Sequence, residues 1–332
     1  MKIDRRNIQL SLSCRLLIGT LILGSASCGG SVDGQEAETE PTVAASKVLA
    51  GPYLQGEWTD DSGTVHVAMW RHDWVENDHV TARCPVPSGW VLVGGGAETF
   101  DNSDRGPLLT ASFPDGATQE WVMQSKDHGL AYVHFARAYC IGLKLDGVTP
   151  DNLRAQTQYI PVDSTGLAQG PSAIALVPST HIMVGGGARA NYTGPGILLY
   201  TNTGLAFPGG GGEWYANGRD HIWADFGSVT AFAIAIPRQP TGYSGTLTAD
   251  TLQFGGSPSG TGYQGLTASE VFPFAMTSVG GETFTTGAGR LLTDVYPTVG
   301  GNARGGVQVW SKDHVFPGSG RSDGRVIGIR KQ

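Results

Sequence analysis

The chain has 332 residues and a formal net charge of −7, and only 15% of its residues are charged. No basic cluster accompanies this acidic balance, so the chain offers nothing to replace phosphate counterions, and nucleic-acid binding is excluded. Glycine accounts for 50 residues, about twice its ordinary share of about 7%. Thr, Val, Ala and aromatic residues are abundant and helical periodicity is missing, which predicts an all-β fold.

Residues 1–27 have the pattern of a signal peptide: a basic start, an apolar run at 16–23 and small residues before Cys28. The apolar run is too short to span a membrane. Small residues before this cysteine suit ordinary cleavage, and they also suit a bacterial lipoprotein box in which Cys28 is lipidated, although Ser25 stands where such boxes usually have Leu.

Residues 28–47 are small, acidic and Pro-containing, as in a solvated tether, which favours lipidation at Cys28. Loss of residues 1–27 removes four basic residues and one acidic residue, which changes the net charge from −7 to −10. We expect an exported protein, held at the cell surface or outer membrane by its lipid, or free in the periplasm or medium. Membrane contact is expected only through that lipid.

The rest of the chain repeats itself three times. Asp-His pairs begin at Asp127, Asp220 and Asp313, and both intervals are 93 residues. A fixed period reports a repeated architecture. We predict three tandem antiparallel β-sandwich or barrel-like repeats of about 93 residues, at 48–146, 147–240 and 241–332.

Each repeat has the same expected order of strands and turns, with turn signals at the 8–12-residue spacing of a small antiparallel sandwich or barrel. The expected parts are a first strand (65–70, 153–160, 247–254), a strand into a glycine cluster (90–93, 181–184, 277–279), a short Leu-Leu strand (108–109, 198–199, 291–292), a turn at Pro114, Pro208 or Pro297, a strand that carries Trp in the first two repeats, and a closing strand (133–143, 229–236, 325–329).

The glycine clusters read Val93-Gly94-Gly95-Gly96-Ala97, Val184-Gly185-Gly186-Gly187-Ala188 and Val279-Gly280-Gly281-Glu282. Glycines at a strand end provide a bulge, positive φ angles or close approach of another backbone. A phosphate-binding loop would need a helix directly after the glycines, and an extended pattern follows instead. The structural interpretation is therefore favoured.

Two cysteines, Cys84 and Cys140, lie within the first repeat, and aligning the second repeat places Ala175 and Ala235 over them. Joint replacement by Ala is what a bonded pair would show, and export permits oxidation. We predict a Cys84–Cys140 disulfide, with two free thiols or half a metal site as the alternative. Two cysteines without a nearby His or Cys partner make a weak zinc site.

A Lys/Arg-Asp-His triplet closes each Trp strand. One interpretation is a turn in which Asp accepts hydrogen bonds from backbone amides. The other is a sugar site, in which Asp and His contact hydroxyl groups and an aromatic ring stacks on the sugar. Period-2 alternation places Trp121 toward the core and Trp310 on the opposite face. The candidate ligand-binding residues are Trp121, Asp127, His128, Trp214, Asp220, His221, Trp310, Asp313 and His314.

The sequence has no His-Glu-x-x-His zinc motif and no Walker loop. We expect no enzyme activity, cofactor or metal site. Triplication favours a multiplied binding surface.

Cys84-Pro85, Gly94-Gly95-Gly96-Ala97, Trp121 and Ala138-Tyr139-Cys140 resemble a short secreted bacterial module, a resemblance that implies no activity. More loosely, the strand plan is similar to that of H-type lectins, whose six-stranded sandwiches act as trimers. This similarity implies a fold, and no sugar-binding motif matches residue by residue. Two hypotheses follow. The first is a lectin-like surface protein that binds a glycan or envelope component, and the second is a structural or protein-interaction lipoprotein without a small-molecule site.

Overall fold

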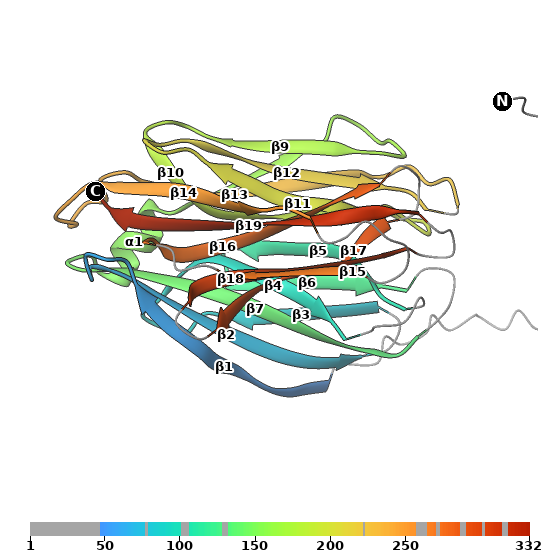
Figure 1. The fold of residues 1–332 in the computed structure, drawn as a ribbon, viewed down its shortest axis with the longest axis horizontal. Coiled ribbons are helices and arrows are strands. Elements are labelled where there is room, and N and C mark those ends of the chain that lie inside the picture. The colour runs from blue at the N-terminus through green and yellow to red at the C-terminus, as the bar shows by residue number, and fades with distance from the viewer. Residues whose placement is uncertain are drawn as a thin grey trace, which may run out of the picture. The chain divides into compact units, whose positions relative to one another are not determined.

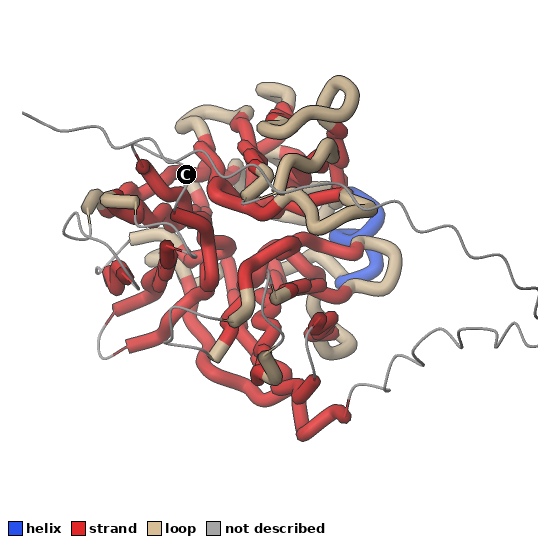
Figure 2. Tube along the Cα trace, turned by 90° about the vertical axis from the view of Figure 1, so that its right-hand side faces the viewer, coloured by secondary structure: helices blue, strands red, loops and turns tan. Residues whose placement is uncertain are grey.

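The protein is all-β, as predicted. The computed structural model describes residues 47–76, 79–100, 106–127, 132–221, 223–256, 264–269, 273–285, 290–300, 303–313 and 318–332. Nineteen strands and one short helix cover these residues (Figures 1 and 2), and no helix among them is long and apolar enough to cross a membrane. Residues 44–332 form one compact unit. The predicted signal peptide, Cys28 and the tether up to residue 46 lie outside the described residues.

Three antiparallel sheets make up the fold, and each combines strands of two repeats. Strands of the third repeat, orange to red in Figure 1, lie beside blue-green strands of the first. In spatial order, the first sheet contains β1 (Lys47–Thr59), β2 (Val65–Glu76), β7 (His134–Leu145), β4 (Val91–Thr99), β17 (Arg290–Gly300), β18 (Ala303–Asp313) and β15 (Gln264–Ser269).

The other two sheets follow the same plan. The second sheet joins the first repeat to the second, and the third sheet joins the second repeat to the third. In spatial order, the second sheet contains β3 (His79–Pro85), β6 (Glu120–Lys126), β5 (Leu108–Asp115), β10 (His181–Asn191), β13 (Ser228–Pro237) and β8 (Gln158–Asp163), and the third contains β14 (Leu247–Phe254), β19 (Gly320–Lys331), β16 (Ala275–Thr285), β11 (Leu198–Ala206), β12 (Gly212–Arg219) and β9 (Ser172–Val177).

The repeats close into a ring through one strand pair per sheet. In each pair, the glycine-cluster strand of one repeat meets the Leu-Leu strand of another: β4 with β17, β10 with β5, and β16 with β11. The cross-strand partners at these junctions are Ala97 with Val295, Ala188 with Ser112, and Gly281 with Asn202. Each repeat therefore pairs with both of the other repeats.

The first glycine of the cluster lies where the three glycine strands meet. Each of these strands has a register shift at this point, next to Gly94, Gly185 or Ser278, as the predicted bulge requires. A Cβ on Gly94 would lie 2.1 Å from the carbonyl oxygen of Thr277, and one on Gly185 would lie 2.1 Å from that of Val93. Strands from all three repeats approach this closely because two of the three positions carry no side chain and the third carries only the small side chain of Ser278.

The third glycine permits the junction between repeats. A Cβ on Gly96 would lie 2.6 Å from the Cα atom of Tyr296, and one on Gly187 would lie 2.4 Å from the carbonyl oxygen of Ser112. Gly280 occupies the same place in the third repeat, where a Cβ would lie 2.7 Å from the Cα atom of Thr203. A glycine is therefore present at all three junctions.

The second glycine makes room for a tryptophan. A Cβ on Gly95 would lie 2.3 Å from the Trp121 ring, and one on Gly186 would lie 2.4 Å from the Trp214 ring. Both rings are fully buried, and each indole N–H donates a hydrogen bond of 2.9 Å, from Trp121 to Ser112 and from Trp214 to Asn202.

The third repeat replaces this whole set with valines. Strand register aligns Val279 with Gly186, Val307 with Trp214, and Val295 with Asn202. Its cluster thus begins two residues earlier than the sequence comparison suggested, with Ser278 and not Gly280 in the place of the first glycine. Since the ring is gone, neither the space of a glycine nor a polar hydrogen-bond acceptor is needed.

The predicted disulfide between Cys84 and Cys140 is present, with 5.5 Å between the Cα atoms. It joins β3 of the second sheet to β7 of the first. The register pairs Cys84 with Trp121 and Ala175 with Trp214, in agreement with the predicted alignment. The equivalent of Cys140 is Ala233, two residues before Ala235, because Cys140 pairs with Gly95 as Ala233 pairs with Gly186.

Two local expectations were wrong. Residues 153–156 belong to helix α1 (Pro150–Gln156) and not to a strand, because Thr149 caps its N-terminus and Pro150 occupies the first turn. Pro114 and Pro297 lie inside β5 and β17, not in turns. Both prolines lie beyond the short stretch that pairs with the neighbouring repeat, so the missing N–H breaks no junction hydrogen bond.

The valine set of the third repeat predicts that substitutions at the equivalent positions of the second repeat have coupled effects on stability. Gly186→Val alone should lower the free energy of unfolding by about 3 kcal/mol or more, because a Cβ there would lie 2.3 Å from the carbonyl oxygen of Phe232 and 2.4 Å from the Trp214 ring. In Trp214→Val the contact with the ring is absent and only the backbone contact remains, so we expect Gly186→Val to cost less stability in Trp214→Val than in the wild type. Urea unfolding measures both differences.

The matched control is Gly255→Val, since nothing lies within 4 Å of a Cβ at that position. It should unfold within about 1 kcal/mol of the wild type. Additive effects of the two core substitutions would contradict the proposed coupling.

Candidate functional site

The structure places the predicted binding residues in three different settings. Trp121 and Trp214 belong to the core, and neither ring presents a face to the surface. The Asp residues of the triplets lie at the ends of β6, β12 and β18. Trp310 is half-buried and borders a recess on the first sheet.

The contacts of the triplets favour the turn interpretation. The Asp127 carboxylate accepts a hydrogen bond from the backbone N–H of Tyr132, and it lies 3.6 Å from the His134 ring. Asp313 is buried, 3.5 Å from the guanidinium of Arg290. The backbone N–H of Asp220 donates to the carbonyl of Gln169. His221 is buried as well, and His128 and His314 lie outside the described residues.

The basic residue that precedes each Asp packs against other parts of the protein. Lys126 and Lys312 are buried, and the Arg219 guanidinium lies 4.0 Å from the centre of the Tyr200 ring. Lys126 donates to the carbonyl of Pro195, and burial lowers the pKa of its ammonium group to about 8, although the charge of Asp225 opposes this shift. At the start of the neighbouring strands β5, β11 and β17, one leucine from each repeat joins a small apolar cluster: Leu108, Leu198 and Leu291.

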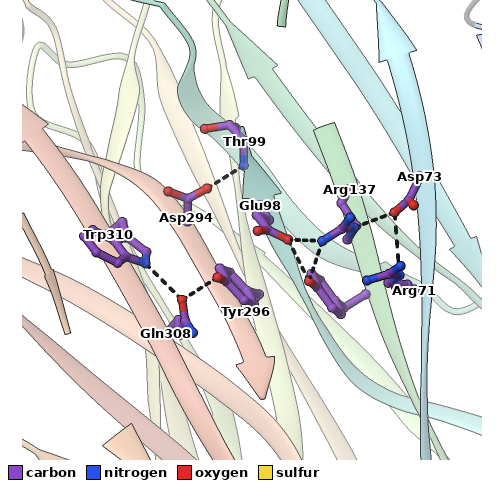
Figure 3. A network of polar contacts seen from close by, with 10 residues as sticks. Arg71, Asp73, Glu98, Thr99, Arg137, Asp294, Tyr296, Gln308 and Trp310 are labelled. Atoms are coloured by element: carbon purple, nitrogen blue, oxygen red, sulfur yellow. Dashed lines mark hydrogen bonds and ion pairs between the residues drawn. The ribbon is translucent and has the colours of Figure 1, made fainter. Parts of the chain in front are cut away.

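The recess beside Trp310 lies where β4 of the first repeat meets β17 and β18 of the third. Its volume is about 300 Å³, within the range of small-ligand sites. Figure 3 shows how the polar side chains here face one another across the repeat boundary. The lining residues are Glu98, Thr99, Phe100, Asp294, Tyr296, Gln308 and Trp310.

Gln308 is oriented by two donors. The Trp310 indole N–H donates to Gln308 Oε1 at 3.1 Å, and the Tyr296 hydroxyl donates to the same oxygen. The amide NH₂ group is thereby turned away from both residues, and no hydrogen bond joins it to another described residue. The Trp310 ring lies directly over Gly265, where a Cβ would come within 2.0 Å of it. One glycine thus lets the indole lie flat on β15.

Glu98 ties the recess to the first repeat. Its carboxylate accepts a 2.6 Å hydrogen bond from the Tyr139 hydroxyl and a 2.9 Å hydrogen bond from Arg137, which also binds Asp73. The Tyr139 ring stacks on Tyr296 of the third repeat, with centroids 5.2 Å apart and planes within 7°. The two repeats therefore share one polar and aromatic network.

Burial and the charge of Glu98 raise the pKa of both tyrosine hydroxyls well above the ordinary range. Burial alone would lower the pKa of Arg137, but its hydrogen bonds to Asp73 and Tyr139 and the charge of Glu98 raise it. Tyr139 and Tyr296 thus remain hydrogen-bond donors, and Arg137 remains charged, at every physiological pH.

Asp294 lines the recess and is almost fully buried. One of its carboxylate oxygens accepts a 2.5 Å hydrogen bond from the backbone N–H of Thr99, and the other accepts one of 2.7 Å from the Thr293 hydroxyl. This acid therefore also fastens β17 to the end of β4.

Of the seven predicted binding residues that the structure describes, only Trp310 borders this recess. Glu98, Tyr296 and Gln308 were missed, because the sequence does not show that β4 and β17 are neighbours. The one available signal was that Trp310 faces the side opposite the core.

Comparison with protein-family models and with curated protein sequences found no match. Within the described ranges, no group of three or more His, Cys, Asp or Glu residues is placed to hold a metal ion. The geometry of the site is therefore the basis for a functional proposal.

The lowered pKa of Lys126 predicts a pH effect on stability. Between about pH 8 and the ordinary lysine pKa of 10.5, the folded chain has lost this proton and the unfolded chain still holds it. The free energy of unfolding of the wild type should therefore rise with pH across this window, relative to Lys126→Met. Urea unfolding of both proteins at pH 7, 8.5 and 10 gives the difference between their free energies of unfolding. The tyrosine titrations are common to both proteins and cancel in this difference. A constant or falling difference would show that Lys126 is not desolvated.

Proposed function

We propose that this chain is an exported surface protein that recognises a glycan or a similar polyhydroxylated envelope polymer in the recess beside Trp310. The observation that carries the proposal is the combination of the flat Trp310 ring with a Gln308 amide oriented by two donors. It is a lectin-like function, with the site between repeats and not in the Asp-His loops.

The chemistry of the recess suits sugar hydroxyl groups. A hydroxyl both donates and accepts a hydrogen bond, and here Gln308, an N–H donor, lines the same recess as the carboxylate acceptors Glu98 and Asp294. Trp310 and Phe100 provide apolar faces for the C–H side of a sugar ring. Donors and acceptors held in place before binding lower the entropic cost of recognition.

Export and lipidation are part of the same proposal. The signal-peptide pattern at 1–27, the cysteine at position 28 and the acidic tether support a chain held outside the cytoplasm by a lipid on Cys28. The Cys84–Cys140 disulfide is compatible with an oxidising compartment.

A second candidate function is a structural or protein-interaction lipoprotein. It is favoured by β9, an edge strand of the third sheet, where Ile174 and Leu176 are 43% and 64% exposed. An exposed apolar edge strand is a surface on which another strand can add.

A glycan array probed with residues 29–332 tests the first proposal, and we expect binding to neutral glycans. Trp310→Ala should weaken binding at least about tenfold, because an aromatic platform is lost. Gln308→Glu is the sharper variant: its carboxylate still accepts from Trp310 and Tyr296, but the N–H donors are gone. We expect it to fold and to lose binding.

The matched control is Trp223→Ala, which removes a tryptophan that is 48% exposed elsewhere on the surface and should leave binding unchanged. Absence of array binding by the wild type, or full binding by Gln308→Glu, would reject this recess as the glycan site and leave the interaction protein as the better description.

A further inference from the structure

The second sheet has a recess at the position equivalent to that of the recess beside Trp310. It lies over the β5–β10 junction between the first and second repeats, with a volume of about 600 Å³. Strand register aligns its residues Arg189, Asn191 and Gln124 with Glu98, Phe100 and Trp310. The place in the fold is the same, but an arginine replaces the acid.

The Arg189 guanidinium is held from two sides. Its Nε–H donates a 2.9 Å hydrogen bond to Asn191 Oδ1. Its Cζ atom lies 5.3 Å from the centre of the Phe113 ring and 5.8 Å from that of Phe232, and these two rings stack with centroids 4.9 Å apart. The two rings come from different repeats, as Tyr139 and Tyr296 do at the other junction.

A chain of directed hydrogen bonds fixes Asn191. Its amide Nδ2 donates to the hydroxyls of Ser228 and Thr230, at 3.3 and 3.0 Å, so Oδ1 must face Arg189. The Thr230 hydroxyl in turn donates to Asp163 at 2.5 Å. Nε already donates to Asn191 Oδ1, and the Asn191 amide is itself held by hydrogen bonds. The guanidinium therefore presents its two terminal NH₂ groups as a fork, which is the geometry that binds a carboxylate through two parallel hydrogen bonds.

The charge of this fork is not neutralised within the described part of the chain. None of those residues places a carboxylate within 4.0 Å of Arg189, whereas Arg137 at the first junction binds both Asp73 and Glu98. The walls of the recess include two exposed apolar side chains, Leu167 at 69% and Phe226 at 59%. A preorganised cation thus lies beside apolar surface and hydroxyl or amide groups.

We propose that this recess binds the carboxylate of a uronic acid residue in an acidic polysaccharide. The Arg189 fork takes the carboxylate, the exposed Phe226 ring covers the C–H face of the sugar, and the polar side chains of Gln124 and Ser228 contact ring hydroxyls. The hydroxyl and amide groups around the fork match the several ring hydroxyls of a sugar acid, each of which can both donate and accept a hydrogen bond.

The site does not depend on the proposed neutral-glycan function. The chain as a whole is acidic, so the attraction is local to Arg189, and its affinity should fall as ionic strength rises. The two proposals are tested with different probes on different sheets, so either can fail alone.

Calorimetric titration of the chain without its predicted signal peptide, with tetragalacturonate as the probe, tests the site. We expect binding that Arg189→Met weakens about tenfold or more, with Arg189→Lys between the two because lysine keeps the charge but not the fork. Arg154→Met is the matched control: it removes an arginine on α1 that pairs with Asp151, and it should bind like the wild type. The methyl ester of the probe, which lacks the carboxylate charge, should not bind.

Four results would overturn the proposal: no binding of tetragalacturonate at 10 mM (roughly the weakest affinity of interest), equal binding of its methyl ester, unchanged affinity in both Arg189 variants, or binding of a tripeptide with a free carboxyl terminus in place of the sugar. Melting temperatures accompany every titration. If Arg189→Met has a lowered melting temperature, the affinity of Arg189→Lys relative to the wild type decides whether the fork binds the carboxylate.

Discussion

The close approach of three glycine-cluster strands is the constraint on which the rest of this structure depends. At the point where β4, β10 and β16 meet, Gly94 and Gly185 each leave no room for a side chain, and Ser278 is the largest residue accommodated. Because these strands come so near one another, each can pair on its outer side with a strand of a different repeat. The composite sheets, the buried tryptophans and both recesses follow from that arrangement.

Each candidate site is assembled from two repeats. In the first sheet, Tyr139 and Tyr296 stack across a junction, and in the second sheet Phe113 and Phe232 do so at the equivalent place. The repeated fold provides an equivalent recess in each of the two sheets, and different residues give the two recesses different chemistry. One has an acid and an amide beside Trp310, and the other has an arginine fork beside Phe226. A single repeat, separated from its neighbours, would contain only half of either site.

The sequence predicted what is local and periodic. The interval of 93 residues, the β-rich composition and the paired cysteines are visible without a structure, and each corresponds to a feature of the fold. The pairing of β4 with β17 is not visible, since nearly 200 positions separate Ala97 from Val295 and no short motif marks the contact. For the same reason the sequence pointed to Trp121 and Trp214, whose conspicuous rings fill the core, and overlooked Gln308. The contacts of Asp127 with the Tyr132 backbone and of Asp313 with Arg290 show that a recurring polar motif can be engaged within the fold.

The closed ring of junctions also constrains how many repeats the fold can contain. In a linear array, a unit can be gained or lost at either end, and its neighbours keep their contacts. Here every repeat divides its strands between two sheets, so deleting one would open two sheets at their centres, and inserting one would leave its strands without partners. The copy number is therefore a property of the whole ring, and divergence between repeats has to proceed by substitution within three fixed places.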